Sequence, residues 1–182
     1  MGETGDFATP EVLRLQSGGN FHADIRTFRD AMASMASTAC LVTTQFGGER
    51  LGRTVTSVFS LSVEPPAILV SIDTSSRLVD HIVKTGRFAF SLLAQGQEAI
   101  ADAFAGKVEA SRRFDIGRWA SWDSGHPRLD GALAAMDCEV LGMIETGTHL
   151  LFAGGVLDIA LAPEKMPLIW HERRYKTLTD TV

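Results

Sequence analysis

The chain has 182 residues, of which 45% are hydrophobic and 21% are charged, and its formal net charge is −5. These values are ordinary for one globular domain, and a chain of this length buries enough surface to fold without disulfides or structural metals. The acidic balance argues against a large nucleic-acid surface, and the sequence shows neither an apolar run long enough for a membrane span nor a basic-then-apolar leader.

The first 22 residues are expected to form an arm. Residues 1–22 mix glycine, threonine, serine, glutamate and asparagine with little periodicity, which predicts a mobile segment ahead of a single domain over 23–182. That domain starts with a helix for which Asp24 is a suitable N-cap. The apolar positions at helical spacing are Ile25, Phe28, Met32 and Met35. We expect this amphipathic helix to lie on the core.

The next segments have the patterns of β-strands. Residues 39–44 form a short strand-like run, and 51–63 alternates apolar with small hydroxyl side chains over 13 residues, which predicts one long strand. Pro65 and Pro66 end it, because proline lacks the N–H that a sheet needs. Further strands are predicted at 67–72, 88–93, 133–145, 149–160 and from 167 onward, with helices at 77–85 and 97–104.

The order of these elements predicts the fold class. About seven strands and three helices occur without regular β-α-β alternation, which favours a mainly β protein. We expect an antiparallel sheet closed into a barrel, with helices on its surface.

Several catalytic signatures are absent from the sequence. It has no G-x-G-x-x-G for a nicotinamide nucleotide bound in the Rossmann manner, and no G-x-S-x-G for a nucleophilic serine. The five histidines show no spacing typical of a metal site, so we expect no metal. Cys40 and Cys138 lie in separate apolar stretches, which predicts two reduced, buried thiols in a cytoplasmic protein, with a catalytic thiol as the less favoured alternative.

Two polar segments remain as candidates for a binding site. Ser75, Ser76 and Arg77 open a predicted helix, where hydroxyls, a guanidinium and free backbone N–H groups would attract a phosphate. The alternative is a plain serine cap beside a solvated arginine. Residues 52–57 place small hydroxyl side chains after a glycine, so a flat heterocycle could approach the backbone closely; the alternative is an exposed polar strand face. Together the two segments suggest a nucleotide-like cofactor.

Short motifs occur in order from about residue 26 to 178. They are F-R-D-A-M-A-S at 28–34, G-x-T-x-T-S-V-x-S-x-S-x-x-P-P at 52–66, F-A-G-K at 104–107, R-F at 113–114, R-W at 118–119, P-R-L at 127–129, D-C at 137–138, G-T-H-L at 147–150, L-I-W at 168–170 and R-Y at 174–175. This series resembles the flavin-reductase-like family with an FMN-binding split barrel. The resemblance is closest to reductase components of two-component flavin monooxygenases, such as 4-hydroxyphenylacetate 3-monooxygenase.

The resemblance implies a homodimer of six-stranded antiparallel split barrels with flanking helices, which bind FMN or FAD near the subunit interface. The implied flavin contacts are Thr54, Val55, Thr56 and Ser57 at the isoalloxazine edge, Leu61 and Ser62 along the ring, Ser71, Ser75, Ser76 and Arg77 near the ribityl phosphate, and Phe104, Ala105, Gly106 and Lys107 beside the phosphate or the entering nucleotide. His149 is implied to position the nicotinamide.

The implied activity is hydride transfer from NADH or NADPH to the flavin, with reduced flavin diffusing to a separate oxygenase. Two alternatives stay open: a flavin-binding carrier or sensor with little turnover, and flavin-mediated reduction of a metal chelate or corrinoid. The sequence departs from the family pattern at two positions. Arg53 either contacts phosphate or alters flavin or nucleotide preference, and His171 stands where relatives often carry an aromatic residue.

Overall fold

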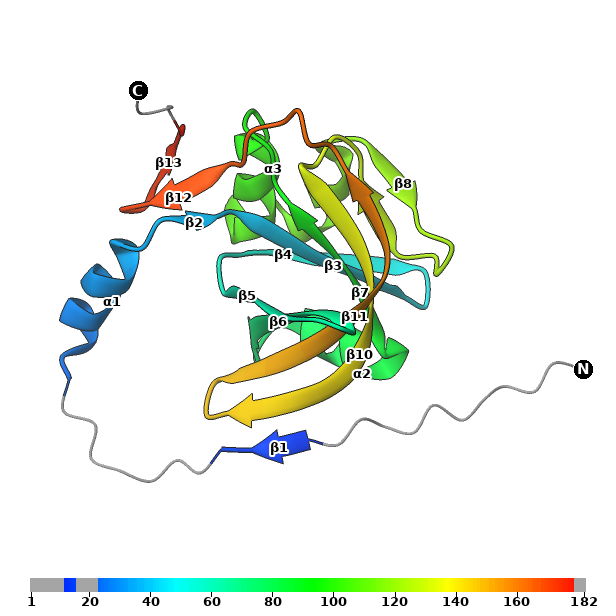
Figure 1. Cartoon of the computed structure of the whole chain (residues 1–182), viewed down its shortest axis with the longest axis horizontal. Coiled ribbons are helices and arrows are strands. Elements are labelled where there is room, and N and C mark those ends of the chain that lie inside the picture. Colours follow the sequence, from blue (N-terminus) through cyan, green and yellow to red (C-terminus); the bar gives the residue numbers. More distant parts are fainter. Residues whose placement is uncertain (1–11, 16–22, 179–182) are drawn as a thin grey trace, which may run out of the picture.

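Seven strands form a curled sheet in which neighbours are antiparallel, in the order β4-β3-β7-β10-β11-β6-β5 (Figure 1). The computed structural model describes residues 12–15 and 23–178. The strands are β3 (Cys40–Phe46), β4 (Glu49–Val55), β5 (Val58–Val63), β6 (Pro66–Asp73), β7 (Arg87–Leu92), β10 (Ala134–Thr146) and β11 (His149–Leu161). The mainly β architecture is confirmed, whereas the number of strands differs from the six that the resemblance implied.

Helices and short strands surround this sheet. Helix α2 (Arg77–Thr85) packs against β3 and β4 and has the predicted bounds; it is capped by Gly86, whose φ of 64° is left-handed. Helix α3 (Glu98–Asp102) continues into a π-helical turn, η1 (Ala103–Lys107), which contacts β4. The remaining elements are α1 (Ile25–Ala33), the 3-10 turn η2 (Ala110–Asp115), the pair β8 (Trp119–Ser121) and β9 (Pro127–Leu129), and a small sheet of β2 (Ser37–Thr38), β12 (Ile169–His171) and β13 (Arg174–Lys176).

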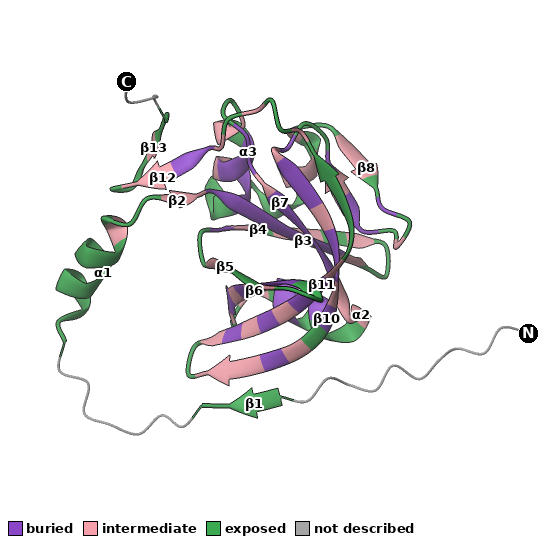
Figure 2. Ribbon diagram, in the orientation of Figure 1, coloured by how far each residue is buried: buried purple, intermediate pink, exposed green. Residues whose placement is uncertain are grey.

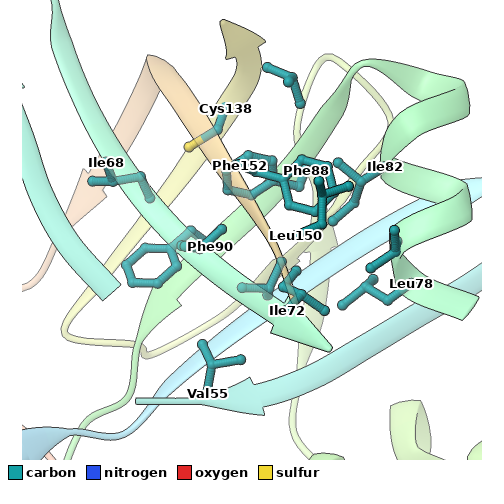
Figure 3. Close-up of a cluster of buried hydrophobic side chains, with 14 of the residues drawn as sticks. Val55, Ile68, Ile72, Leu78, Ile82, Phe88, Phe90, Cys138, Leu150 and Phe152 are labelled. Atoms are coloured by element: carbon teal, nitrogen blue, oxygen red, sulfur yellow. The ribbon is translucent and has the colours of Figure 1, made fainter. Parts of the chain in front are cut away.

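Strand β3 is buried on both faces from Cys40 to Thr44, which explains the apolar run with which it begins. Cys40 and Val42 belong to the core cluster drawn in Figure 3, which includes side chains from the curled sheet and α2. Ala39 and Leu41, which alternate with them, belong to a second cluster that includes residues of α3 and η1. One strand therefore joins two cores, and the segments that carry the candidate site lie around it.

The predicted single strand over 51–63 is wrong. It is interrupted at Thr56 and Ser57, and its halves, β4 and β5, stand at opposite ends of the strand order. Of the apolar residues in this alternating pattern, Val55 is buried, but Phe59 and Val63 are exposed, and Val63 is 87% exposed. Alternation shows that side chains divide between two faces, but it does not determine which strands pair or what covers each face.

The predicted final strand is a hairpin. Strands β12 and β13 pair with each other, and Glu172 and Arg173 turn between them with positive φ angles of 49° and 60°. Neither residue type signals such a turn, because positive φ is usually left to glycine or asparagine.

Helix α1 is capped as predicted but is not laid on the core. The Asp24 carboxylate accepts a hydrogen bond from the Thr27 N–H at 2.7 Å. No residue of the helix is buried, and Ile25 and Phe28 on its apolar face are 70% and 58% exposed. Figure 2 shows α1 exposed along almost its whole length, so the amphipathic pattern has no partner within the described residues of the chain.

Part of the predicted arm lies in the described residues. Val12–Arg14 forms strand β1, which pairs in parallel with β10, and Arg14 Nε lies 2.8 Å from Glu145 Oε2. The sequence predicted no regular structure for these residues. Residues 1–11 and 16–22 lie outside the described residues, so the mobile arm and the boundary of the domain at residue 23 stay predictions.

The two thiols are buried and free, as expected. Burial raises the pKa of Cys40 and of Cys138 to about 12, so both are protonated near neutral pH and neither is an activated nucleophile. Over residues 12–15 and 23–178, no helix is long and apolar enough to cross a membrane. In the same ranges, no three His, Cys, Asp or Glu side chains are grouped as they would be around a metal ion.

Candidate functional site

A cavity of about 240 Å³ lies where β4 ends. Strand β4 supplies one wall, η1 another, and the β12–β13 hairpin a third. The lining residues are Ala39, Thr54, Val55, Thr56, Asp102, Ala105, Lys107, Trp170 and Tyr175. Five of the residues implied by the resemblance are therefore brought together here: Thr54, Val55, Thr56, Ala105 and Lys107.

The backbone beside this cavity carries two free donors. Thr56 and Ser57 lie outside any strand, both are exposed, and neither N–H donates a hydrogen bond to any described residue. The Thr54 side chain is fixed by helix α3, because its hydroxyl donates to the Ala101 carbonyl at 2.7 Å. Adjacent exposed N–H groups next to a cavity fit the edge of a flat heterocycle that carries hydrogen-bond acceptors, as the flavin isoalloxazine does.

Close packing behind β4 supports this edge. A Cβ atom on Gly52 would lie 2.7 Å from the Phe104 ring and 3.0 Å from Thr43. The Phe104 ring is buried and packs edge-on against Phe114 and Trp119. Phe104 therefore supports the wall from behind instead of lining the cavity, while Ala105 and Lys107 of the same motif line it.

A second polar group lies at the end of β6 and the start of β11. His149 pairs in register with Asp73, and its Nδ1 lies 2.9 Å from the Thr148 hydroxyl. The pKa of Asp73 is lowered, first by hydrogen bonds from Ser75 and then by electrostatic interaction with the His149 and Arg53 side chains. Arg53, where the sequence departs from the family pattern, and His149, from a family motif, therefore both influence the Asp73 carboxylate.

The predicted phosphate site contains two carboxylates. Ser75 donates from both its N–H and its hydroxyl to Asp73, at 2.8 and 2.7 Å. Arg77 Nη2 lies 2.6 Å from Glu49 Oε2. Ser76 is the N-cap of α2 but makes no side-chain capping bond. The Val79 N–H donates to the Ser76 carbonyl at 3.0 Å, and the N–H groups of Arg77 and Leu78 remain as donors for an anion.

The other predicted contacts are spread along β5 and β6. Ser71 lies beside Ser57, since the Ser71 N–H donates to the Ser57 carbonyl at 3.1 Å and the Ser57 hydroxyl donates to the Ser71 carbonyl at 2.9 Å. Leu61 is exposed on β5, and Ser62 lines a different depression between β5 and β11. Gly106 turns η1 with a φ of 102° and contributes no side chain. The predicted contacts therefore do not form one group: some line the cavity, some lie at the start of α2, and Leu61 and Ser62 lie at neither.

Four residues of the cavity were missed by the sequence interpretation: Ala39, Asp102, Trp170 and Tyr175. Tyr175 donates to Asp102 Oδ1 at 2.7 Å, and Lys107 Nζ lies 2.9 Å from Asp102 Oδ2. Trp170 packs edge-on against Tyr175 at 4.9 Å between ring centroids. The motifs at 168–170 and 174–175 signalled that Trp170 and Tyr175 matter, but only the hairpin between them brings the two rings to the cavity.

Comparison with known proteins adds independent evidence. Residues 32–179 match the model of a family described as flavin reductase like domain. An FMN reductase (NADH) of Pseudomonas syringae is 34% identical over 171 residues, a match that covers 94% of this chain and 93% of that protein.

Solved structures show the same similarity. The flavin reductase of styrene monooxygenase from Pseudomonas putida superposes with a TM-score of 0.75 at 27% identity, covering 86% of this chain and 99% of that one. An NADH:FAD oxidoreductase of Streptomyces globisporus, in complex with NAD and FAD fragments, gives a TM-score of 0.80 at 26% identity, covering 86% and 93%.

Proposed function

The chain belongs to the flavin reductase like domain family, and we propose that it reduces FMN with NADH at the cavity beside Thr56 and Ser57. The observation that carries the proposal is the pair of backbone N–H groups at these two exposed residues, which donate to no described residue and lie beside the cavity that Thr56 lines. A flavin ring needs such donors along its pyrimidine edge, and a sheet normally uses them for its own ladder. FAD and NADPH are further substrates to compare in the assay.

The flavin, when bound, supplies the redox chemistry by accepting hydride from the dihydronicotinamide. The residues of the chain bind and orient. In this proposal Thr56 and Ser57 hold the ring edge, and the α2 terminus at Ser76 and Arg77 holds the phosphate. Backbone donors aimed at the ring also stabilise the negative charge that hydride brings.

His149 is proposed to position the nicotinamide. Its ring is restrained by the Thr148 hydroxyl at 2.9 Å, and it lies in register with Asp73 across from β6. A restrained imidazole at this point can donate to or accept from an amide without taking part in the transfer itself. Arg53, near the same carboxylate, is proposed to select for phosphate-bearing ligands.

The curled sheet is proposed to be the split barrel of the family and to work as a homodimer. Phe59 and Val63 of β5 and the apolar face of α1 are exposed in a single chain, and a second copy would cover such surfaces. Because relatives of this kind serve monooxygenases, we propose that reduced flavin leaves the site and reaches a separate oxygenase by diffusion.

The test is NADH oxidation followed at 340 nm, with purified protein and added FMN, FAD or riboflavin. We expect flavin-dependent oxidation of NADH with many turnovers per protein. Protein that retains flavin through dialysis but oxidises no NADH would instead indicate a carrier and would contradict the proposal.

A further inference from the structure

The rim of the cavity carries two opposed charges, of which Lys107 belongs to the F-A-G-K motif and Asp102 to none of the motifs. Asp102, the last residue of α3, offers one carboxylate oxygen to the Tyr175 phenol at 2.7 Å and the other to the Lys107 ammonium at 2.9 Å. All three residues line the cavity that is proposed to hold the flavin ring. They come from α3, η1 and the β12–β13 hairpin, so one carboxylate joins three elements of the wall.

The hydrogen bonds keep this carboxylate ionised. The pKa of Asp102 is lowered, first by the Tyr175 hydrogen bond and then by Lys107, while burial and the same carboxylate raise the pKa of Tyr175. Tyr175 therefore stays a neutral donor near neutral pH, and the charges at the rim are those of Asp102 and Lys107. The Lys107 side chain is 67% exposed, so a ligand in the cavity can approach it.

We propose that Asp102 is a positioning residue that fixes the Lys107 ammonium and the Tyr175 phenol at the rim of the cavity, and that the Asp102 and Lys107 charges set the relative affinity for reduced and oxidised flavin. The inference rests on the proposed function. Hydride transfer converts the dihydronicotinamide into a nicotinamide cation and brings one negative charge into the flavin site. A nearby ammonium favours the more negative reduced form, and a nearby carboxylate opposes it.

This assignment predicts opposite effects for the two charges. Lys107→Met should raise the ratio of the dissociation constants for reduced and oxidised FMN about threefold to tenfold. Asp102→Asn, which keeps the shape and an oxygen that accepts from Tyr175, should lower the same ratio by a similar factor. A tenfold change corresponds to about 30 mV for a two-electron couple.

The experiment measures the dissociation constant of oxidised FMN by fluorescence quenching and the midpoint potential of bound FMN, and derives the ratio from both. Lys107→Arg, which keeps the positive charge, should leave the ratio within about twofold of the wild type. Tyr175→Phe keeps both charges and should weaken the binding of reduced and oxidised FMN alike. Matched charge controls are Glu164→Gln and Lys165→Met, since neither residue lines the cavity.

The outcomes separate the two proposals. Potentials that move in opposite directions for Lys107→Met and Asp102→Asn, with unchanged controls, support the assignment even if one variant loses affinity. Shifts in the same direction, or ratios that stay within about twofold, overturn it and leave a merely structural salt bridge, while NADH oxidation by the wild type still stands. Wild-type protein that does not oxidise NADH in the presence of flavin overturns the proposed function, and this inference with it.

Discussion

At the scale of single residues, Arg77 shows how a predicted ligand contact is already occupied. Its guanidinium lies 2.6 Å from Glu49, and the same carboxylate oxygen lies 3.5 Å from His81 Nε2. An exposed ion pair of this kind contributes little to stability, so it can exchange for a phosphate at small cost. Glu49 would then compete with the phosphate for Arg77 and weaken binding of phosphate-bearing flavins.

Substitutions at this pair should separate FMN from riboflavin. We expect Arg77→Ala to raise the dissociation constant of FMN about threefold to tenfold, because the phosphate loses a charged donor, and to leave riboflavin unchanged. Glu49→Gln should lower the FMN constant about twofold by removing the competitor. Titrations monitored by flavin fluorescence give both values, and an equal loss for both flavins would remove Arg77 from the phosphate site.

At the scale of elements, the residues of the F-A-G-K motif have different roles within one helical turn, η1. Phe104 packs into the second core, Gly106 turns the chain with a φ of 102°, and Lys107 reaches the cavity. Gly52 on β4 makes this possible, because the Phe104 ring occupies the space that a side chain at residue 52 would need. The motif therefore describes a contact between η1 and β4 more than a set of ligand contacts.

Adding one methyl group at Gly52 should disturb both the core and the site. We expect Gly52→Ala to cost about 1–3 kcal/mol of unfolding free energy, because the new Cβ would lie 2.7 Å from the Phe104 ring. FMN affinity should fall as η1 is displaced. Urea unfolding provides the test, with Gly142→Ala as control since nothing lies within 4 Å of its added Cβ. Equal midpoints for the two variants would contradict the steric argument.

At the scale of the whole molecule, the described chain leaves apolar surface uncovered. Helix α1 stands beside the sheet and is attached through the β12–β13 turn, where Arg173 Nη2 lies 2.6 Å from Asp30 Oδ1 and the Glu172 N–H donates to the Ala33 carbonyl at 2.7 Å (Figure 1). The same hairpin carries Tyr175 to the cavity. A partner that covers α1 would therefore act on the hairpin that forms one wall of the site.

The proposed homodimer should depend on the exposed face of β5. We expect the wild type to sediment at twice its monomer mass of 19.7 kDa, and Phe59→Glu to shift it toward the monomer, because a charge replaces apolar surface in the interface. Flavin affinity should weaken with the dimer. Val83→Glu, at an exposed apolar position on α2, is the control. Dimer mass that is unchanged by Phe59→Glu would exclude β5 from the interface.

The sequence by itself determined what depends on neighbours along the chain. The Asp24 cap, the helix at 77–85 and the strands at 133–145 and 149–160 each follow from local sequence, and the order of motifs was enough to identify the family. Periodicity also separated the two faces of the strands. Periodicity could not show that the predicted strand over 51–63 is interrupted at Thr56, because an alternating pattern does not determine which strands pair.

Only the tertiary structure decided which side chains meet. Asp102, Lys107 and Tyr175 come together across 73 residues of sequence, and Arg53 influences the pKa of Asp73 although their strands are not neighbours in the sheet. Such contacts depend on how the sheet curls and where the β12–β13 hairpin packs. Both depend on how the two core clusters pack against β3, which no short stretch of sequence determines. The sequence therefore established the fold class and the family, and the packing decided which charges surround the site.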